Sequence, residues 1–112
     1  MADPTIALTE AVYYILLSLV KPLHGYGIMQ NVETLTDGRV KLAAGTLYGA
    51  INTLLERGWI RALPEKKNSR RKEYVITDLG RSTLNNEIVR LKELLSNGNR
   101  ILGGQQNEKD SP

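Results

Sequence analysis

Apolar residues recur with helical spacing in four segments of the chain. The first predicted helix runs from about Thr9 to Lys21, with Thr9 as its N-cap and Pro22 directly after its end. Its apolar side chains lie on nearly every face. A helix of this kind is typically buried on more than one side, inside its own domain and against a partner chain.

The next two predicted helices lie close together in the sequence. The turn at residues 24–27 (HGYG) leads into a helix over about 26–36, and the Asp-Gly pair at 37–38 ends that helix with a left-handed stop. Polar and apolar residues alternate over 39–42, which predicts a short extended segment. The third helix is expected from Ala44 to Arg57, with a glycine as its C-terminal stop.

The two faces of the third predicted helix differ in character. One face is apolar and points to the core, at Leu47, Ile51, Leu54 and Leu55. The other face carries small or hydrogen-bonding side chains, where a helix exposed only for solubility usually has Glu–Lys pairs. This second face is suited to close approach to another surface. Its residues are Gly45, Thr46, Tyr48, Gly49, Asn52, Thr53 and Glu56.

Two strand-like segments follow, at residues 59–63 and 72–77, and both alternate between apolar and polar residues. The net charge of the chain is only +3. Residues 39–81, however, hold ten bases against four acids, so this part of the chain must contain any surface that binds a polyanion. Five of these bases stand in the turn between the strands: Lys66, Lys67, Arg70, Arg71 and Lys72.

A fourth helix is predicted from the cap at Thr77 or Asp78 to about Asn97. Few elements are left to cover this helix, which favours a partner chain, although packing within its own monomer is the alternative. Residues 98–112 are polar and glycine-rich and predict a flexible tail. The apolar positions of the helix follow the 4-3-4 spacing of a coiled-coil seam, at Leu84, Ile88, Leu91 and Leu95.

Three helices and a basic hairpin predict a mainly α (α+β) protein, with a winged helix-turn-helix over residues 1–77 and a C-terminal dimerisation helix over 78–97. The third helix would enter the major groove, where Asn52 is suited to a bidentate pair with adenine. Tyr48 would donate its hydroxyl to a phosphate or, alternatively, pack on the hairpin. The hairpin bases would add affinity and salt dependence, and the alternative is that they form a solvated turn.

Three motifs occur in the same order as in a known family: HGYGI at 24–28, GTLY at 45–48, and RRKEYVITDLG at 70–80. Over residues 5 to 95 the chain resembles the PadR family of transcription regulators, and its length resembles the short subfamily. The resemblance implies a dimer in which the C-terminal helices pack against the partner's first helix. It also implies a repressor that leaves its operator when an effector acts.

The resemblance extends the predicted dimer interface to Val12 and Leu16 on the first helix. Some drug-responsive members stack a planar ligand on a tryptophan of the C-terminal helix. This chain has Leu91 and no aromatic residue after Tyr74, so that mode of binding is not expected. Tyr13 and Tyr14 are the hypothesised effector-binding residues instead.

Several classes of protein are disfavoured by what the sequence lacks. It contains no cysteine, and no apolar run reaches the ~20 residues that span a bilayer, so we expect a cytoplasmic protein. No nucleophile–base pair, phosphate loop or set of metal ligands stands out, so we expect neither an enzyme nor a cofactor or metal. His24 is interpreted as structural, and Trp59, Tyr74 and Ile76 as core residues.

The sequence as a whole predicts a homodimeric repressor that binds a pseudo-palindromic operator in double-stranded DNA, with a small-molecule effector as a further partner. The alternative is a winged-helix module that binds another protein and does not read DNA.

Overall fold

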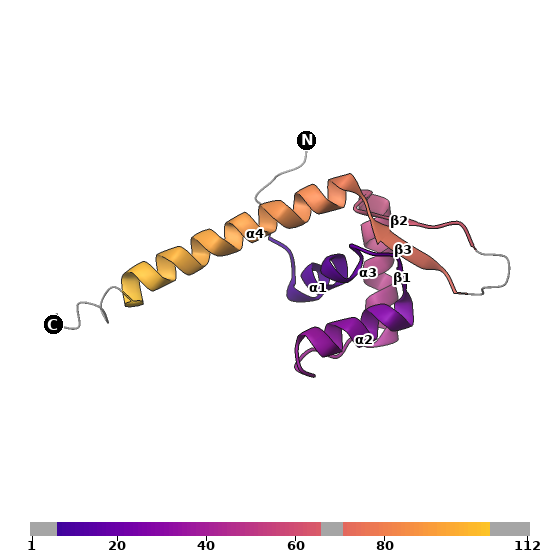
Figure 1. The fold of residues 1–112 in the computed structure, drawn as a ribbon, viewed down its shortest axis with the longest axis horizontal. Coiled ribbons are helices and arrows are strands. Elements are labelled where there is room, and N and C mark those ends of the chain that lie inside the picture. The colour runs from indigo at the N-terminus through magenta and orange to yellow at the C-terminus, as the bar shows by residue number, and fades with distance from the viewer. Residues whose placement is uncertain (1–6, 66–70, 104–112) are drawn as a thin grey trace. The chain divides into compact units, whose positions relative to one another are not determined.

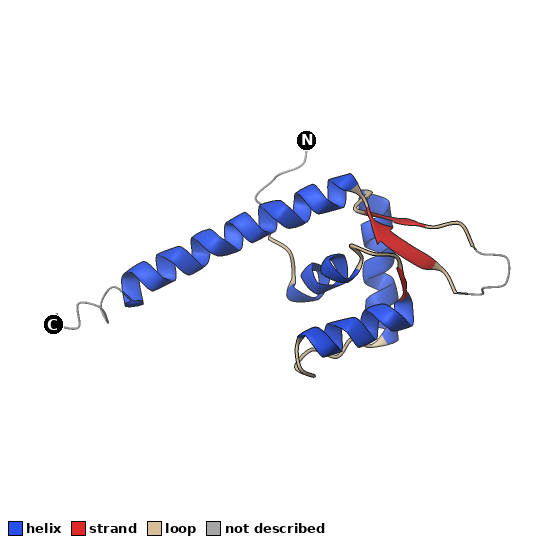
Figure 2. Ribbon diagram, viewed as in Figure 1, coloured by secondary structure: helices blue, strands red, loops and turns tan. Residues whose placement is uncertain are grey.

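The computed structural model describes residues 7–65 and 71–103. These residues belong to two compact units, one over Leu8–Leu84 and one that contains the chain from Asn85 onward. The first unit holds three helices and a small sheet, and the second is formed by the continuation of the last long helix (Figures 1 and 2).

The three helices of the first unit are α1 (Glu10–Ser18), α2 (Gly25–Leu35) and α3 (Ala44–Arg57). Thr9 caps α1 as predicted, because its hydroxyl accepts a 3.1 Å hydrogen bond from the Val12 N–H. Helix α1 ends three residues earlier than the sequence predicted. Helix α3 has the predicted bounds.

The sheet has three antiparallel strands in the order β1-β3-β2 (Figure 2). The predicted hairpin is present as β2 (Ile60–Ala62) and β3 (Glu73–Ile76). The third strand, β1 (Leu23–His24), was not predicted and places Leu23 opposite Tyr74. The extended segment expected over 39–42 forms no strand.

Left-handed residues end α2 and α3, as the sequence predicted. Gly58 has φ 75° and closes α3, and the Trp59 N–H donates a 3.0 Å bond to the Leu54 carbonyl. The same role at the end of α2 falls to Asp37 and Gly38, with φ 53° and 82°. The stop at Gly58 turns the chain directly into β2.

Helix α4 (Asp78–Gly98) begins in close contact with the hairpin. The Thr77 hydroxyl accepts from the Gly80 N–H at 3.0 Å and donates to the Gly58 carbonyl at 2.6 Å. A Cβ on Gly80 would lie 2.0 Å from the Trp59 carbonyl oxygen, so only glycine fits there.

The second unit continues the α4 helix. After Gly98 the chain forms a π-helical turn (Asn99–Gly103), within the segment predicted to be a flexible tail. The rest of that segment lies outside the described residues. None of the helices in residues 7–65 and 71–103 combines the length and apolar character needed to cross a bilayer.

The core of the first unit is formed by apolar side chains from every helix and from two of the strands. Of the predicted core residues, Leu47, Ile51 and Leu54 are buried on α3. Leu35, at the end of α2, is 52% exposed. The buried core residues are Ile15, Leu16, Leu19, Ile28, Val32, Leu47, Ile51, Leu54, Ile60, Tyr74, Ile76 and Leu84.

Candidate nucleic-acid interface

The polar face of α3 is exposed along its whole length. Apart from the exposed Glu56 near its C-terminal end, the side chains of this face are short or uncharged, and a Cβ added to Gly45 or Gly49 would meet no atom within 4 Å. The Thr53 hydroxyl donates to the Gly49 carbonyl of the preceding turn at 3.3 Å. The exposed residues that the sequence predicted for this face are Gly45, Thr46, Tyr48, Gly49, Asn52 and Thr53.

The base of the hairpin places two of the predicted cations beside α2. Arg71 and Lys72 are both exposed. The Arg71 Nη1 lies 2.8 Å from the His24 Nε2, and the guanidinium donates this hydrogen bond because it has no acceptor of its own. The remaining predicted DNA-binding bases, Lys66, Lys67 and Arg70, lie outside the described residues.

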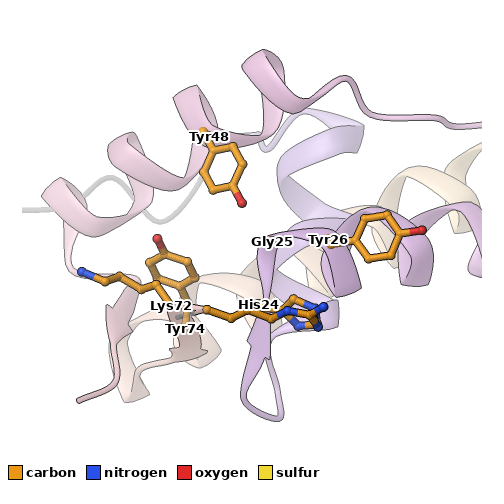
Figure 3. A pocket seen from close by; sticks show the side chains of 7 residues that line it. His24, Gly25, Tyr26, Tyr48, Lys72 and Tyr74 are labelled. Atoms are coloured by element: carbon orange, nitrogen blue, oxygen red, sulfur yellow. The ribbon is translucent and has the colours of Figure 1, made fainter. Parts of the chain in front are cut away.

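A hollow of about 390 Å³ lies among the start of α2, α3 and the base of β3 (Figure 3). Tyr48 of α3 and Tyr74 of β3 extend toward the same space, whereas the ring of Tyr26 extends outward. His24, Gly25, Arg71 and Lys72 complete the lining. The hollow is therefore built from three separate segments of the chain.

Gly25 allows Tyr48 to pack against the first turn of α2. A Cβ on Gly25 would lie 2.1 Å from the Tyr48 Oη and 2.7 Å from its Cζ, so any side chain at position 25 would force the Tyr48 ring to move. The Tyr48 hydroxyl therefore rests on the backbone at the start of α2, while the side chain as a whole is 46% exposed. Tyr48 therefore lies on the exposed face of α3, at the edge of the hollow.

Tyr74 faces the hollow from below, although only 7% of the residue is exposed. Burial raises the pKa of its hydroxyl, and the neighbouring Tyr48 contributes to the same shift. The group is thus protonated at neutral pH and can donate a hydrogen bond.

The residues predicted for a dimer interface fall into two groups. Leu91 and Leu95 are exposed on α4, by 38% and 64%, and Val12 and Ile88 are half-buried. The predicted interface role of Leu16 and Leu84 is wrong, because both side chains are packed in the core of the first unit and offer almost no surface to a partner.

The two residues predicted for effector binding lie together on α1. The rings of Tyr13 and Tyr14 meet edge to face, with centroids 5.6 Å apart, and both side chains are half-buried. They do not line the hollow at the start of α2.

Sequence reasoning missed the part that residues 23–25 and Tyr74 play in building the hollow. His24 was assigned a structural role and Tyr74 a core role, and both do have these roles. The available signal was the glycine at position 25, at the start of a helix, since a glycine there often marks a close approach of another group to the backbone.

A helix pair with an exposed polar second helix, followed by a β-hairpin, defines the winged-helix domains of transcription regulators. The sequence model of the PadR-like family of transcriptional regulators matches residues 14–86, which is more than half of the chain. The chain belongs to this family.

A relative in sequence is an uncharacterized 37.1 kDa protein in transposon TN4556 of Streptomyces fradiae. The two are 38% identical over 66 residues, which is 59% of this chain and 18% of that protein. The chain thus spans less than a fifth of the length of this relative.

Solved structures share the fold. A PadR family regulator from Eggerthella lenta is 26% identical, with a TM-score of 0.68 over 81% of this chain and 80% of that one. A PadR-like transcription factor from Bacteroides fragilis is 27% identical, with a TM-score of 0.66 over 81% and 87%. Bacillus subtilis PadR in complex with operator DNA is 18% identical, with a TM-score of 0.59 over 70% and 46%, a likeness in fold alone.

Proposed function

We propose that this chain is a homodimeric repressor that binds a pseudo-palindromic operator in double-stranded DNA and is released by an effector. The exposed polar face of α3, beside the cations at the base of the hairpin, is the observation that carries this proposal. A helix that presents glycine, threonine and asparagine has groups that can hydrogen-bond to base edges, and these small side chains allow the helix to approach the floor of the major groove closely. Bacillus subtilis PadR, which shares the fold, was solved with operator DNA.

In this proposal the two kinds of residue have different tasks. Asn52 reads a base, because its amide can both donate to and accept from adenine in the major groove. Lys72 binds the phosphate backbone, which contributes affinity for any sequence. Lys66, Lys67, Arg70 and Arg71 are assigned the same backbone role.

The experiment first selects a binding site from a random DNA pool and then measures affinity by fluorescence anisotropy at two salt concentrations. Asn52→Ala is expected to lose about 1–3 kcal/mol of discrimination between the selected site and a site changed at one base pair. Lys72→Ala is expected to weaken both sites equally and to reduce the salt slope by about 1. Lys92→Ala, which removes the same exposed charge from α4, serves as the control. A protein without site preference at any salt concentration would instead be a protein-interaction module.

The dimer is proposed from the exposed leucines of α4. Leu91 and Leu95 follow the seam spacing on α4, and Leu94 beside them adds further exposed apolar surface that a solvated helix does not need. Leu91→Glu is expected to yield monomers in light scattering and to weaken operator binding, whereas Glu93→Gln on the same helix leaves the dimer intact. A dimer that survives Leu91→Glu refutes this interface.

The effector is proposed to bind at Tyr13 and Tyr14. Their half-buried rings offer an aromatic surface on α1, the helix predicted to contact the partner's α4. In a screen of small aromatic compounds for release of the operator, Tyr13→Ala is expected to abolish the response without changing operator affinity in the absence of compound.

A further inference from the structure

One side-chain hydrogen bond joins the base of the hairpin to the start of α2. His24 is the last residue of β1 and the N-cap of α2, and Arg71 comes two residues before β3 begins at Glu73. The two side chains meet at 2.8 Å, between the Arg71 Nη1 and the His24 Nε2. The bond therefore connects segments that are 47 residues apart in the chain, one in the helix pair and one in the hairpin.

The imidazole ring has a defined position at this junction. Its Cε1 packs against the first turn of α2, since a Cβ added to Gly27 would lie 3.1 Å from that atom. The Tyr26 ring lies beside it, with centroids 6.5 Å apart (Figure 3). His24 makes no capping hydrogen bond to α2, and its ring is bonded to Arg71 instead.

This hydrogen bond requires one protonation state of the imidazole. A guanidinium has donors only, so Nε2 is the acceptor and the bond exists only while Nε2 carries no proton. Histidine side chains ordinarily change charge between about pH 5 and 8, and a protonated ring is a donor at both nitrogens. The contact would then join two donors of like charge, so it cannot persist once the ring is protonated.

The charged groups around the ring favour a change of partner on protonation. Glu73 stands directly opposite His24 in the β1–β3 ladder, and opposed residues project from the same face of a sheet with Cβ atoms about 4.5–5.5 Å apart. Its carboxylate attracts an imidazolium, whereas Arg71 and Lys72 repel one. The other titratable groups that line the hollow with His24 are phenol hydroxyls, which ordinarily stay uncharged below about pH 10, on Tyr26, Tyr48 and Tyr74.

We infer that the His24–Arg71 bond is a pH-sensitive tether, which holds the base of the hairpin against α2 at neutral pH and releases it when His24 is protonated. In this inference His24 is a positioning residue that acts through Arg71. The effect of the tether on DNA binding rests on the proposed function, because the tether orders the cations at the base of the hairpin before DNA binds. Ordering a segment in advance lowers the entropic cost of binding. The operator is therefore bound more weakly at acid pH.

The first measurement follows the tether in the full-length protein without DNA. His24 is the only histidine of the chain, so its ring nitrogens can be assigned directly in a long-range proton–nitrogen correlation spectrum. At about pH 7.5 we expect the ring proton on Nδ1 and none on Nε2, and at about pH 5.5 we expect protons on both. The Arg71 side-chain signals and the amide exchange of residues 71–73 should change over the same pH range. A proton on Nε2 at the higher pH, or Arg71 signals that do not follow the ring, would overturn the tether.

The second measurement is operator affinity at the same two pH values and constant ionic strength. The unaltered protein is expected to bind about threefold more weakly at the lower pH, the effect of one exposed hydrogen bond. His24→Gln supplies a carbonyl oxygen that can accept from Arg71 but takes up no proton, so its affinity should be equal at both pH values. Arg71→Ala has no such bond to lose, and its affinity should be equally insensitive to pH.

Lys72→Ala is the matched control for these variants. It removes the neighbouring exposed cation but leaves the tether in place, so it should weaken binding at both pH values and keep the threefold difference between them. Thermal unfolding at about pH 7.5 should give His24→Gln a melting temperature close to that of the original protein. The nitrogen spectrum of the unaltered protein tests the tether even where a variant fails to fold.

The outcomes separate the tether from its alternatives. An affinity that rises at the lower pH, for operator and random DNA alike, would mean that His24 acts as one more cation and not as a tether. A pH response that survives in both His24→Gln and Arg71→Ala comes from other groups and contradicts the inference. If the nitrogen spectrum shows the tether but no DNA sequence is preferred at any salt concentration, the proposed function is wrong while the tether stands.

Discussion

Substitution of Gly49 is expected to change the stability of the protein and its affinity for DNA in opposite directions. It lies in the middle of the 14-residue helix α3, on the exposed face, and a Cβ added there meets nothing within 4 Å. Gly49→Ala therefore introduces no clash and no strain within the protein. It replaces the second-poorest helix former with the best one, which should raise the free energy of unfolding by about 0.8–1.0 kcal/mol.

The same methyl group would stand between α3 and the DNA. If the helix approaches the groove as closely as proposed, the added atom costs about 1–3 kcal/mol of binding free energy, or roughly 5- to 150-fold in affinity. Urea unfolding and anisotropy with the selected operator measure the two effects on one sample. Asn86→Ala on α4, also exposed on a helix, should stabilise without altering affinity. A Gly49→Ala variant that is more stable and binds DNA unchanged refutes close approach by this face.

Two further substitutions test the packing around the hairpin. Gly80→Ala sets a Cβ 2.0 Å from the Trp59 carbonyl oxygen, a backbone atom that cannot move cheaply, so urea unfolding should show a loss of about 2 kcal/mol or more; unchanged stability contradicts the contact. Burial raises the pKa of Tyr74, so its contribution to stability is fully present below the unfolded pKa of about 10 and is lost as the pH rises through the folded value. Thermal melts of Tyr74→Phe should therefore decline less above pH ~10 than those of the original protein, and an equal decline contradicts the shift.

The elements that the sequence predicted well are those defined by local signals. The apolar positions of helix α3 are three and four residues apart, and a glycine directly follows Arg57. The faces and the end of this helix can therefore be predicted from 15 consecutive residues. Strand β1 has only two residues, which is too short for any alternation to be recognised. It is a strand because Leu23 and His24 pair with β3, some fifty residues later in the chain.

In the candidate site, too, the part defined by local signals was predictable and the part that depends on contacts between distant segments was not. The polar face of α3 was predictable, because residue types on one helix show which face is free of bulk. The hollow was not, since it depends on Gly25, Tyr48 and Tyr74 coming together from three segments. The leucine spacing on α4 was visible in the sequence, but the burial of Leu84 depends on the packing of the first unit, which spacing alone does not describe.

The position of β3 between β1 and β2 decides which changes of length this domain can accept. Successive side chains of a strand point to opposite sides, so the loss or gain of one residue inside 73–76 would turn Tyr74 and Ile76 out of the core. Both neighbouring strands would then be mispaired at once. We therefore expect single-residue deletions within β3 to abolish folding, even where substitutions at Glu73 or Val75 are harmless, so that length is more tightly constrained here than composition.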